Sequence, residues 1–91
     1  MKISLVVPCY NEQETVRIFY DETVKVLKEI GYDYEIIYIN DGSKDNTLSE
    51  LIKLYEDYPD EIKVIDFSRN FGKEAGMYAG LEHATGDYIT V

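Results

Sequence analysis

Three short apolar segments of this 91-residue chain are each followed at once by a cluster of polar residues. The apolar segments are residues 3–7, 34–39 and 62–67, and they are rich in the β-branched side chains that favour strands. Between them, apolar residues recur at helical spacing. Strands that alternate with helices predict a parallel sheet, because right-handed crossovers return each strand to the same direction. All three polar clusters should then gather at the carboxyl edge of one sheet, where ligands bind in open α/β folds.

The alternation predicts the order βαβαβαβ, a parallel, doubly wound, Rossmann-like α/β fold. Asn11, with a glutamate three residues later, resembles the start of a capped helix, and Gly31 is a natural end for it. The second and third helices are expected over about residues 46–58 and 73–85. A fourth strand begins at Tyr88, so residues 1–91 are expected to be a piece of a longer protein, truncated in or just after that strand.

Charge and composition limit the possible partners. The chain has 18 acidic and 9 basic residues and a net charge of −9, which argues against nonspecific nucleic-acid binding. The single cysteine, Cys9, cannot form an internal disulfide, and the N-terminus lacks a signal-peptide pattern. No apolar run reaches the roughly 18 residues of a membrane span. A cytoplasmic location is therefore expected.

The first polar cluster differs from a phosphate-binding loop because it contains no glycine. Dinucleotide-binding folds need a glycine-rich turn after the first strand, so that backbone amides reach the pyrophosphate. Here Pro8 stiffens the turn, Tyr10 offers a flat aromatic face and Glu12 offers a hydrogen-bond acceptor. These groups suit a base and a ribose better than a phosphate.

The second and third clusters supply complementary chemistry. Asp41 ends the second strand, where doubly wound folds often place an acid that binds ribose or base, and Gly42 and Ser43 follow it. An ordinary Asp-Gly-Ser turn explains these three residues equally well. Arg69 and Lys73 bring two cations to the start of the third helix, which suits a diphosphate, although a solvated basic loop has the same pattern. Together, the three clusters favour a nucleotide-diphosphate ligand.

Two other reactive side chains carry weaker signals. His83 lies in the third expected helix without a nearby cysteine or second histidine, which favours a packing or surface role over metal binding. Cys9 has no histidine partner in the sequence, which argues against a nucleophile. We therefore assign neither His83 nor Cys9 a catalytic or metal-binding role.

Four blocks of sequence match the pattern of one known family. They are VPCYNE at residues 7–12, NDGSKDNT at 40–47, SRNFGKEAG at 68–76 and ATGDY at 84–88. In content, order and spacing these blocks resemble the inverting family 2 glycosyltransferases of the GT-A fold. The third block is most similar to the subgroup that transfers a sugar from a nucleotide to a polyprenyl phosphate.

The resemblance implies a glycosyltransferase that uses a nucleotide-sugar donor, usually a UDP-sugar. Its acceptor would be a lipid phosphate such as polyprenyl phosphate, at the cytoplasmic face of a membrane. In this family, the positions that match Pro8, Tyr10 and Glu12 line the nucleoside pocket, and the acid that matches Asp41 accepts a hydrogen bond from the base. The two cations of the third cluster match positions on the diphosphate side.

The resemblance also implies parts that this chain does not include. The metal-binding Asp-x-Asp of the family follows the fourth strand, beyond Val91, and the acid that deprotonates the acceptor comes later still. Mg²⁺ or Mn²⁺ is therefore expected in the full-length enzyme and not in this fragment, which should bind nucleotide without transferring sugar. The fragment should also self-associate, because its fourth strand leaves an exposed apolar edge.

Two other protein classes share the alternating pattern. A nonenzymatic nucleotide-binding or regulatory module would bind nucleotide without sugar transfer in any length of polypeptide. A phospho-receiver domain needs an acidic pair after the first strand and an acceptor aspartate at the end of the third. Glu12 stands alone and Asp66 lies within the third strand, so the receiver class is disfavoured.

Overall fold

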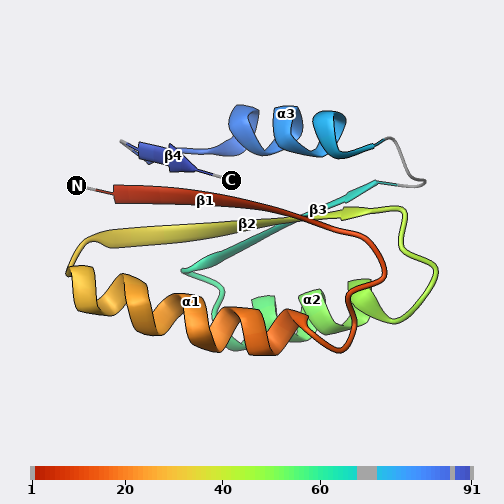
Figure 1. Ribbon diagram of the computed structural model, residues 1–91, viewed down its shortest axis with the longest axis horizontal. Coiled ribbons are helices and arrows are strands. Elements are labelled where there is room, and N and C mark those ends of the chain that lie inside the picture. Colours follow the sequence, from red (N-terminus) through yellow and green to blue (C-terminus); the bar gives the residue numbers. More distant parts are fainter. Residues whose placement is uncertain (1, 68–71, 87, 91) are drawn as a thin grey trace.

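The computed structural model describes residues 2–67, 72–86 and 88–90, and these form a four-stranded parallel sheet with helices on both faces (Figure 1). The strands are Lys2–Cys9 (β1), Asp33–Asp41 (β2), Ile62–Phe67 (β3) and Tyr88–Thr90 (β4), and the helices are Val16–Ile30 (α1), Thr47–Asp57 (α2) and Lys73–His83 (α3). Across the sheet the strands lie in the order β3-β2-β1-β4, and every pair is parallel. The predicted α/β fold is confirmed.

The two faces of the sheet have separate cores. α1 and α2 pack on one face, where the buried core includes Tyr38 of β2 and Leu51 of α2 (Figure 1). α3 lies on the opposite face, over Val6 and Ile37. Because β2 is central, residues 36–39 are buried on both faces, which explains why this strand is a continuous apolar run.

Small residues allow α3 to approach the sheet closely. A Cβ added at Gly80 would lie 2.3 Å from Cγ1 of Val6, and one added at Gly76 would lie 3.4 Å from Cγ2 of Ile39. A larger side chain at position 80 would therefore push the helix away from β1 and β2.

Two helix ends show how local sequence and tertiary contacts compete. α1 ends at Ile30, and Gly31 caps it as predicted, with a φ of 83° that glycine adopts without strain. α3 ends at His83, two residues before the predicted end, because the backbone amides of Thr85 and Gly86 donate to side chains of the sheet instead. None of the helices in the described part of the chain is long and apolar enough to cross a bilayer.

Candidate functional site

The first two polar clusters meet at the carboxyl edge of the sheet, which is the edge where the parallel strands end. The backbone amide of Asn11 donates to Oγ of Ser43 at 3.0 Å, and that of Glu12 donates to Oγ1 of Thr47 at 2.8 Å. In return, the amide of Lys44 donates to Oδ1 of Asn11 at 2.8 Å. Side-chain bonds therefore fix the loop after β1 against the loop after β2.

Asn11 has a different role from the helix cap that its sequence position suggested. α1 begins only after Thr15, and the side chain of Asn11 points to the loop after β2. The φ of Asn11 is 53°, a left-handed conformation that asparagine adopts more readily than most residues. Gln13 makes a parallel link, because its Oε1 accepts a bond from the amide of Asn46 at 2.8 Å. Sequence reasoning missed both links, which depend on a loop distant in the chain.

Asp41 joins the second cluster to the third. Its side chain is buried at the end of β2, with the residue only 5% exposed, and its Oδ2 accepts a bond from the amide of Gly72 at 3.1 Å. Gly72 directly precedes α3. Arg69 lies outside the described residues, and so does the side chain of Lys73, whose backbone begins α3. Asp41 therefore lies beside the segment where the two cations are expected.

A hollow of about 630 Å³ opens at this edge, against the loop after β2 and the ends of β2 and β3. Three of the predicted site residues line it, namely Tyr10, Gly42 and Ser43. Tyr10 is 41% exposed, so its ring is available to stack on a flat ligand. The hollow has a size typical of small-ligand sites.

Asn40 and Asp66 also line this hollow, although the sequence analysis assigned neither of them to the nucleotide site. Nδ2 of Asn40 donates to Oδ1 of Asp66 at 2.8 Å. Oδ1 of Asn40 is buried and has no hydrogen-bond partner among the described residues. In the sequence, the only sign that Asn40 and Asp66 could belong to a ligand site was their position near the ends of β2 and β3. An unsatisfied acceptor beside a hollow is a group that a ligand can complete.

Pro8 and Glu12 line a second, smaller hollow of about 250 Å³, against β1 and the start of α1. Cys9 and Tyr38 are also in its wall. Burial, together with the nearby Glu12 carboxylate, raises the pKa of the Cys9 thiol to about 12, so the thiol stays protonated at neutral pH and is a poor nucleophile. The predicted nucleoside residues are thus divided between two hollows that both border the end of β1.

Asp45 supports the loop after β2. Its Oδ1 accepts bonds from the amide of Thr47 at 2.9 Å and from the hydroxyl of Thr47 at 2.5 Å. The hydroxyl bond is the main reason that the pKa of Asp45 lies below its ordinary value. Asp45 is therefore a charged acceptor that is already used by its own loop.

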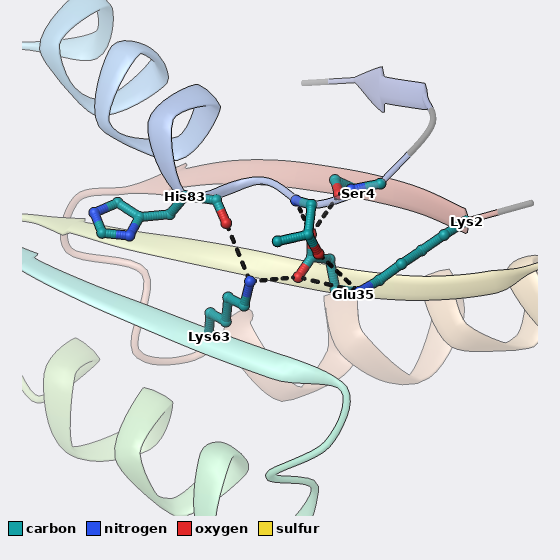
Figure 2. A network of polar contacts seen from close by, with 7 residues as sticks. Lys2, Ser4, Glu35, Lys63 and His83 are labelled. Atoms are coloured by element: carbon teal, nitrogen blue, oxygen red, sulfur yellow. Dashed lines mark hydrogen bonds and ion pairs between the residues drawn. The ribbon is translucent and has the colours of Figure 1, made fainter.

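Across residues 2–67, 72–86 and 88–90, no group of three His, Cys, Asp or Glu side chains could hold a metal ion. His83 is the last residue of α3, and its imidazole points away from Glu35 (Figure 2). Its backbone oxygen accepts a bond from Nζ of Lys63 at 3.1 Å. The carboxyl edge of the described chain thus offers aromatic, amide and carboxylate groups for a ligand.

The sequence model of one protein family, described as glycosyl transferase family 2, matches residues 4–91. A prophage bactoprenol glucosyl transferase homolog of Escherichia coli strain K12 is 52% identical over 90 residues, which cover 98% of this chain and 29% of that protein. A bactoprenol glucosyl transferase of Shigella phage SfX is 50% identical, with 98% and 29% covered. The chain therefore spans less than a third of the length of these relatives.

Solved structures with this fold include the mannosyltransferase PcManGT from Pyrobaculum calidifontis, in complex with GDP-Man and Mn²⁺. Its TM-score is 0.76 at 25% identity, over 96% of this chain and 25% of that one. TarS 1-349 of S. aureus has a TM-score of 0.73 at 25% identity, over 100% of this chain and 27% of that one. Both proteins carry the present fold as about a quarter of a longer chain.

Proposed function

Because this chain belongs to glycosyl transferase family 2, we propose that the protein that carries it transfers a sugar from a nucleotide-sugar to a lipid phosphate. The family and its GT-A fold were both predicted from the sequence, and both are confirmed. The observation that carries the proposal is the carboxyl edge of the sheet, where an exposed Tyr10 borders a hollow and Asp41 is buried close to the start of α3.

The nucleoside would bind against the loop after β1. Tyr10 offers an aromatic face on which a base can stack. The carboxylate of Asp41 can accept a hydrogen bond from an N–H group of the base, in addition to the amide that it already accepts. Pro8 and Glu12 would border the base and the ribose from the end of β1.

The diphosphate would lie toward the start of α3. Arg69 and Lys73 are the cations that we assign to it, since positive charge and a helix N-terminus both favour a phosphate group. Gly42 and Ser43 border the hollow between the loop after β2 and Tyr10, where the rest of the nucleotide would bind.

The donor that we propose is a UDP-sugar and the acceptor is polyprenyl phosphate. The names of the bactoprenol glucosyl transferase relatives support a polyprenyl acceptor, and the GDP-Man complex of the mannosyltransferase supports a nucleotide-sugar donor. A water-soluble donor and a lipid acceptor meet at a membrane surface, so we place the reaction at its cytoplasmic face.

The described residues do not fit a metal site, and we assign no metal to them. We propose that Mg²⁺ or Mn²⁺, which would offset charge on the departing diphosphate, is held by another part of the full-length protein. The acid that deprotonates the acceptor would also lie there. By itself, this chain would bind nucleotide without transferring sugar.

The test combines nucleotide binding and sugar transfer in the full-length protein. Calorimetry should show that Asp41→Asn weakens UDP binding about 10- to 100-fold, because the buried acceptor loses its charge and one of its two oxygens becomes an N–H donor, while the amide of Gly72 already needs an acceptor. Asp57→Asn is the matched control, since Asp57 is an exposed residue paired with Arg17 at 3.0 Å and should leave binding unchanged. Labelled UDP-glucose and polyprenyl phosphate should yield a labelled lipid.

Three outcomes would count against the proposal. If neither UDP nor GDP binds, the carboxyl edge is not a nucleotide site. If Asp41→Asn binds UDP as tightly as the wild type, Asp41 does not belong to the site. If nucleotide binds but no labelled lipid forms with Mg²⁺ or Mn²⁺ present, the nonenzymatic nucleotide-binding module becomes the better description.

We also propose that the 91-residue polypeptide self-associates when it is expressed alone. Among the described strands, β4 lies at the end of the sheet beside β1, and an uncovered edge strand can pair with a second copy. Light scattering should show dimers or larger species as concentration rises. A stable monomer at high concentration would contradict this proposal.

A further inference from the structure

A buried carboxylate lies at the amino edge of the sheet, which is the edge where the parallel strands begin. Glu35, near the start of β2, is only 3% exposed, and five polar contacts converge on it (Figure 2). Its Oε2 accepts bonds from Oγ of Ser4 at 2.5 Å and from the amide and hydroxyl of Thr85 at 2.7 and 3.0 Å. Nζ of Lys63 lies 2.8 Å from its Oε1, and that of Lys2 lies 3.7 Å away.

The groups around Glu35 hold residues 83–86, which connect α3 to β4. The amide of Gly86 donates to Oγ of Ser4 at 2.8 Å, and the backbone oxygen of His83 accepts a bond from Nζ of Lys63 at 3.1 Å. A Cβ at Gly86 would lie 2.5 Å from Oγ of Ser4, so only glycine fits there. Side chains from β1, β2 and β3 therefore provide the hydrogen bonds of a segment that is neither helix nor strand.

This connection determines where the chain enters the sheet as β4. Tyr88 lies two residues after Gly86 and pairs with Ile3 of β1. A shift of one residue in this pairing would turn every side chain of β4 to the other face of the sheet. Because β4 is parallel to β1, the chain runs along β4 in the direction of the edge that carries the polar clusters, and its last described residue, Thr90, pairs with Leu5. The contacts at the amino edge thus set the line along which the chain approaches the candidate site.

We propose that Glu35 is a positioning residue for sugar transfer. Its carboxylate fixes the register of β4 against β1 and, through β4, the line along which the chain runs toward the carboxyl edge. The inference rests on the proposed function. Glu35 is six residues before Asp41 on the same strand, which is about 20 Å in an extended chain, so it acts through β4 and not by contact with the nucleotide.

Glu61 provides a matched control for effects on stability alone. It is also a glutamate at the amino edge, and its Oε1 accepts bonds from the hydroxyls of Tyr20, at 3.1 Å, and Tyr34. These tyrosines belong to α1 and β2 and pack in the core on the face opposite α3. Loss of the Glu61 carboxylate should therefore loosen the α1 side of the sheet and leave the connection to β4 in place.

The experiment compares Glu35→Gln and Glu61→Gln in the full-length protein. Glu35→Gln should lower kcat about 10- to 100-fold, as expected when reacting groups are misplaced by about an ångström. Its nucleotide Kd should stay within about twofold of the wild type, because the loops that bind nucleotide are distant from Glu35. Hydrogen exchange should become faster in residues 84–90. Glu61→Gln should change neither kcat nor the exchange of that segment.

Thr85→Val serves as a milder variant in case Glu35→Gln does not fold, because it removes one hydroxyl from an exposed residue of the network. Like Glu35→Gln, it should lower kcat and make hydrogen exchange in residues 84–90 faster, but both by a smaller factor. The proposal is overturned if Glu35→Gln leaves kcat unchanged. It is also overturned if Glu35→Gln and Glu61→Gln both lower kcat and both weaken nucleotide binding. If the wild type transfers no sugar, the proposed function fails. Separately, if Glu35→Gln leaves hydrogen exchange in residues 84–90 unchanged, Glu35 does not fix the register of β4.

Discussion

The two ends of the sheet use carboxylates in opposite ways. At the amino edge, Glu35 is buried and accepts from donors on three other segments of the chain, including Ser4 and Thr85. At the carboxyl edge, Asp66 is exposed beside an open hollow, and the neighbouring Asn40 keeps a buried oxygen without a partner in the described chain. A buried carboxylate surrounded by hydrogen-bond donors and lysine ammonium groups stabilises the fold, whereas a buried oxygen without a donor or cation beside a hollow is suited to a ligand.

The largest expected effect tests the stabilising role of Glu35 directly. Glu35→Leu should lower the free energy of unfolding by about 2–4 kcal/mol, because buried donors such as Oγ of Ser4 and the amide of Thr85 lose their acceptor. Lys63, whose side chain is 42% exposed, can turn to water and limits the loss. Urea denaturation measures the change.

The control for this substitution lies at the other end of the sheet. Asp66→Asn keeps an oxygen that can accept the bond from Asn40, and its site is exposed, so its free energy of unfolding should stay within about 0.5 kcal/mol of the wild type. If Glu35→Leu and Asp66→Asn lowered the free energy of unfolding equally, the carboxylates of the two edges would contribute equally to stability, and the contrast between the edges would be wrong.

A smaller effect is expected from α3, which connects the two edges. Gly80→Ala should lower the free energy of unfolding by about 1–2 kcal/mol, because the added Cβ would lie 2.3 Å from Val6, and this clash outweighs the better helix propensity of alanine. Since α3 begins beside Asp41 and ends beside Lys63, its displacement should also weaken nucleotide binding.

The control for the helix substitution is Tyr78→Ala. Tyr78 is 66% exposed on the same helix, so its removal should leave both stability and nucleotide affinity close to wild type. Urea denaturation and calorimetry measure both variants. If Gly80→Ala lowered stability without changing nucleotide affinity, α3 would not transmit changes to the carboxyl edge.

The order of strands and helices could be predicted because it depends on the local spacing of apolar residues. The position of Asp41 at the end of β2 could be predicted too, since strand ends in a parallel sheet follow from the spacing of apolar residues, whereas its role in binding stays a prediction. Glu35 could not, because in the sequence it is one charged residue within an apolar strand, and its partners come from distant segments. Asn11 failed for a related reason: its local pattern indicated a helix cap, whereas its bond is to Lys44 in another loop.

The last expected effect concerns pH. Burial raises the pKa of Glu35, but the bonds from Lys63, Ser4 and Thr85 outweigh burial and lower this pKa from its ordinary value of 4.5 to about 2. Because the pKa is lower in the folded state, the carboxylate stabilises that state fully above pH 4.5 and loses this contribution as the pH falls toward 2. Urea denaturation of the wild type and Glu35→Gln should therefore show a difference in free energy of unfolding that is widest near neutral pH and narrows in acid. A constant difference down to acid pH would mean that the donors around Glu35 do not favour its charged form, and the contrast between the two edges would then rest on burial alone.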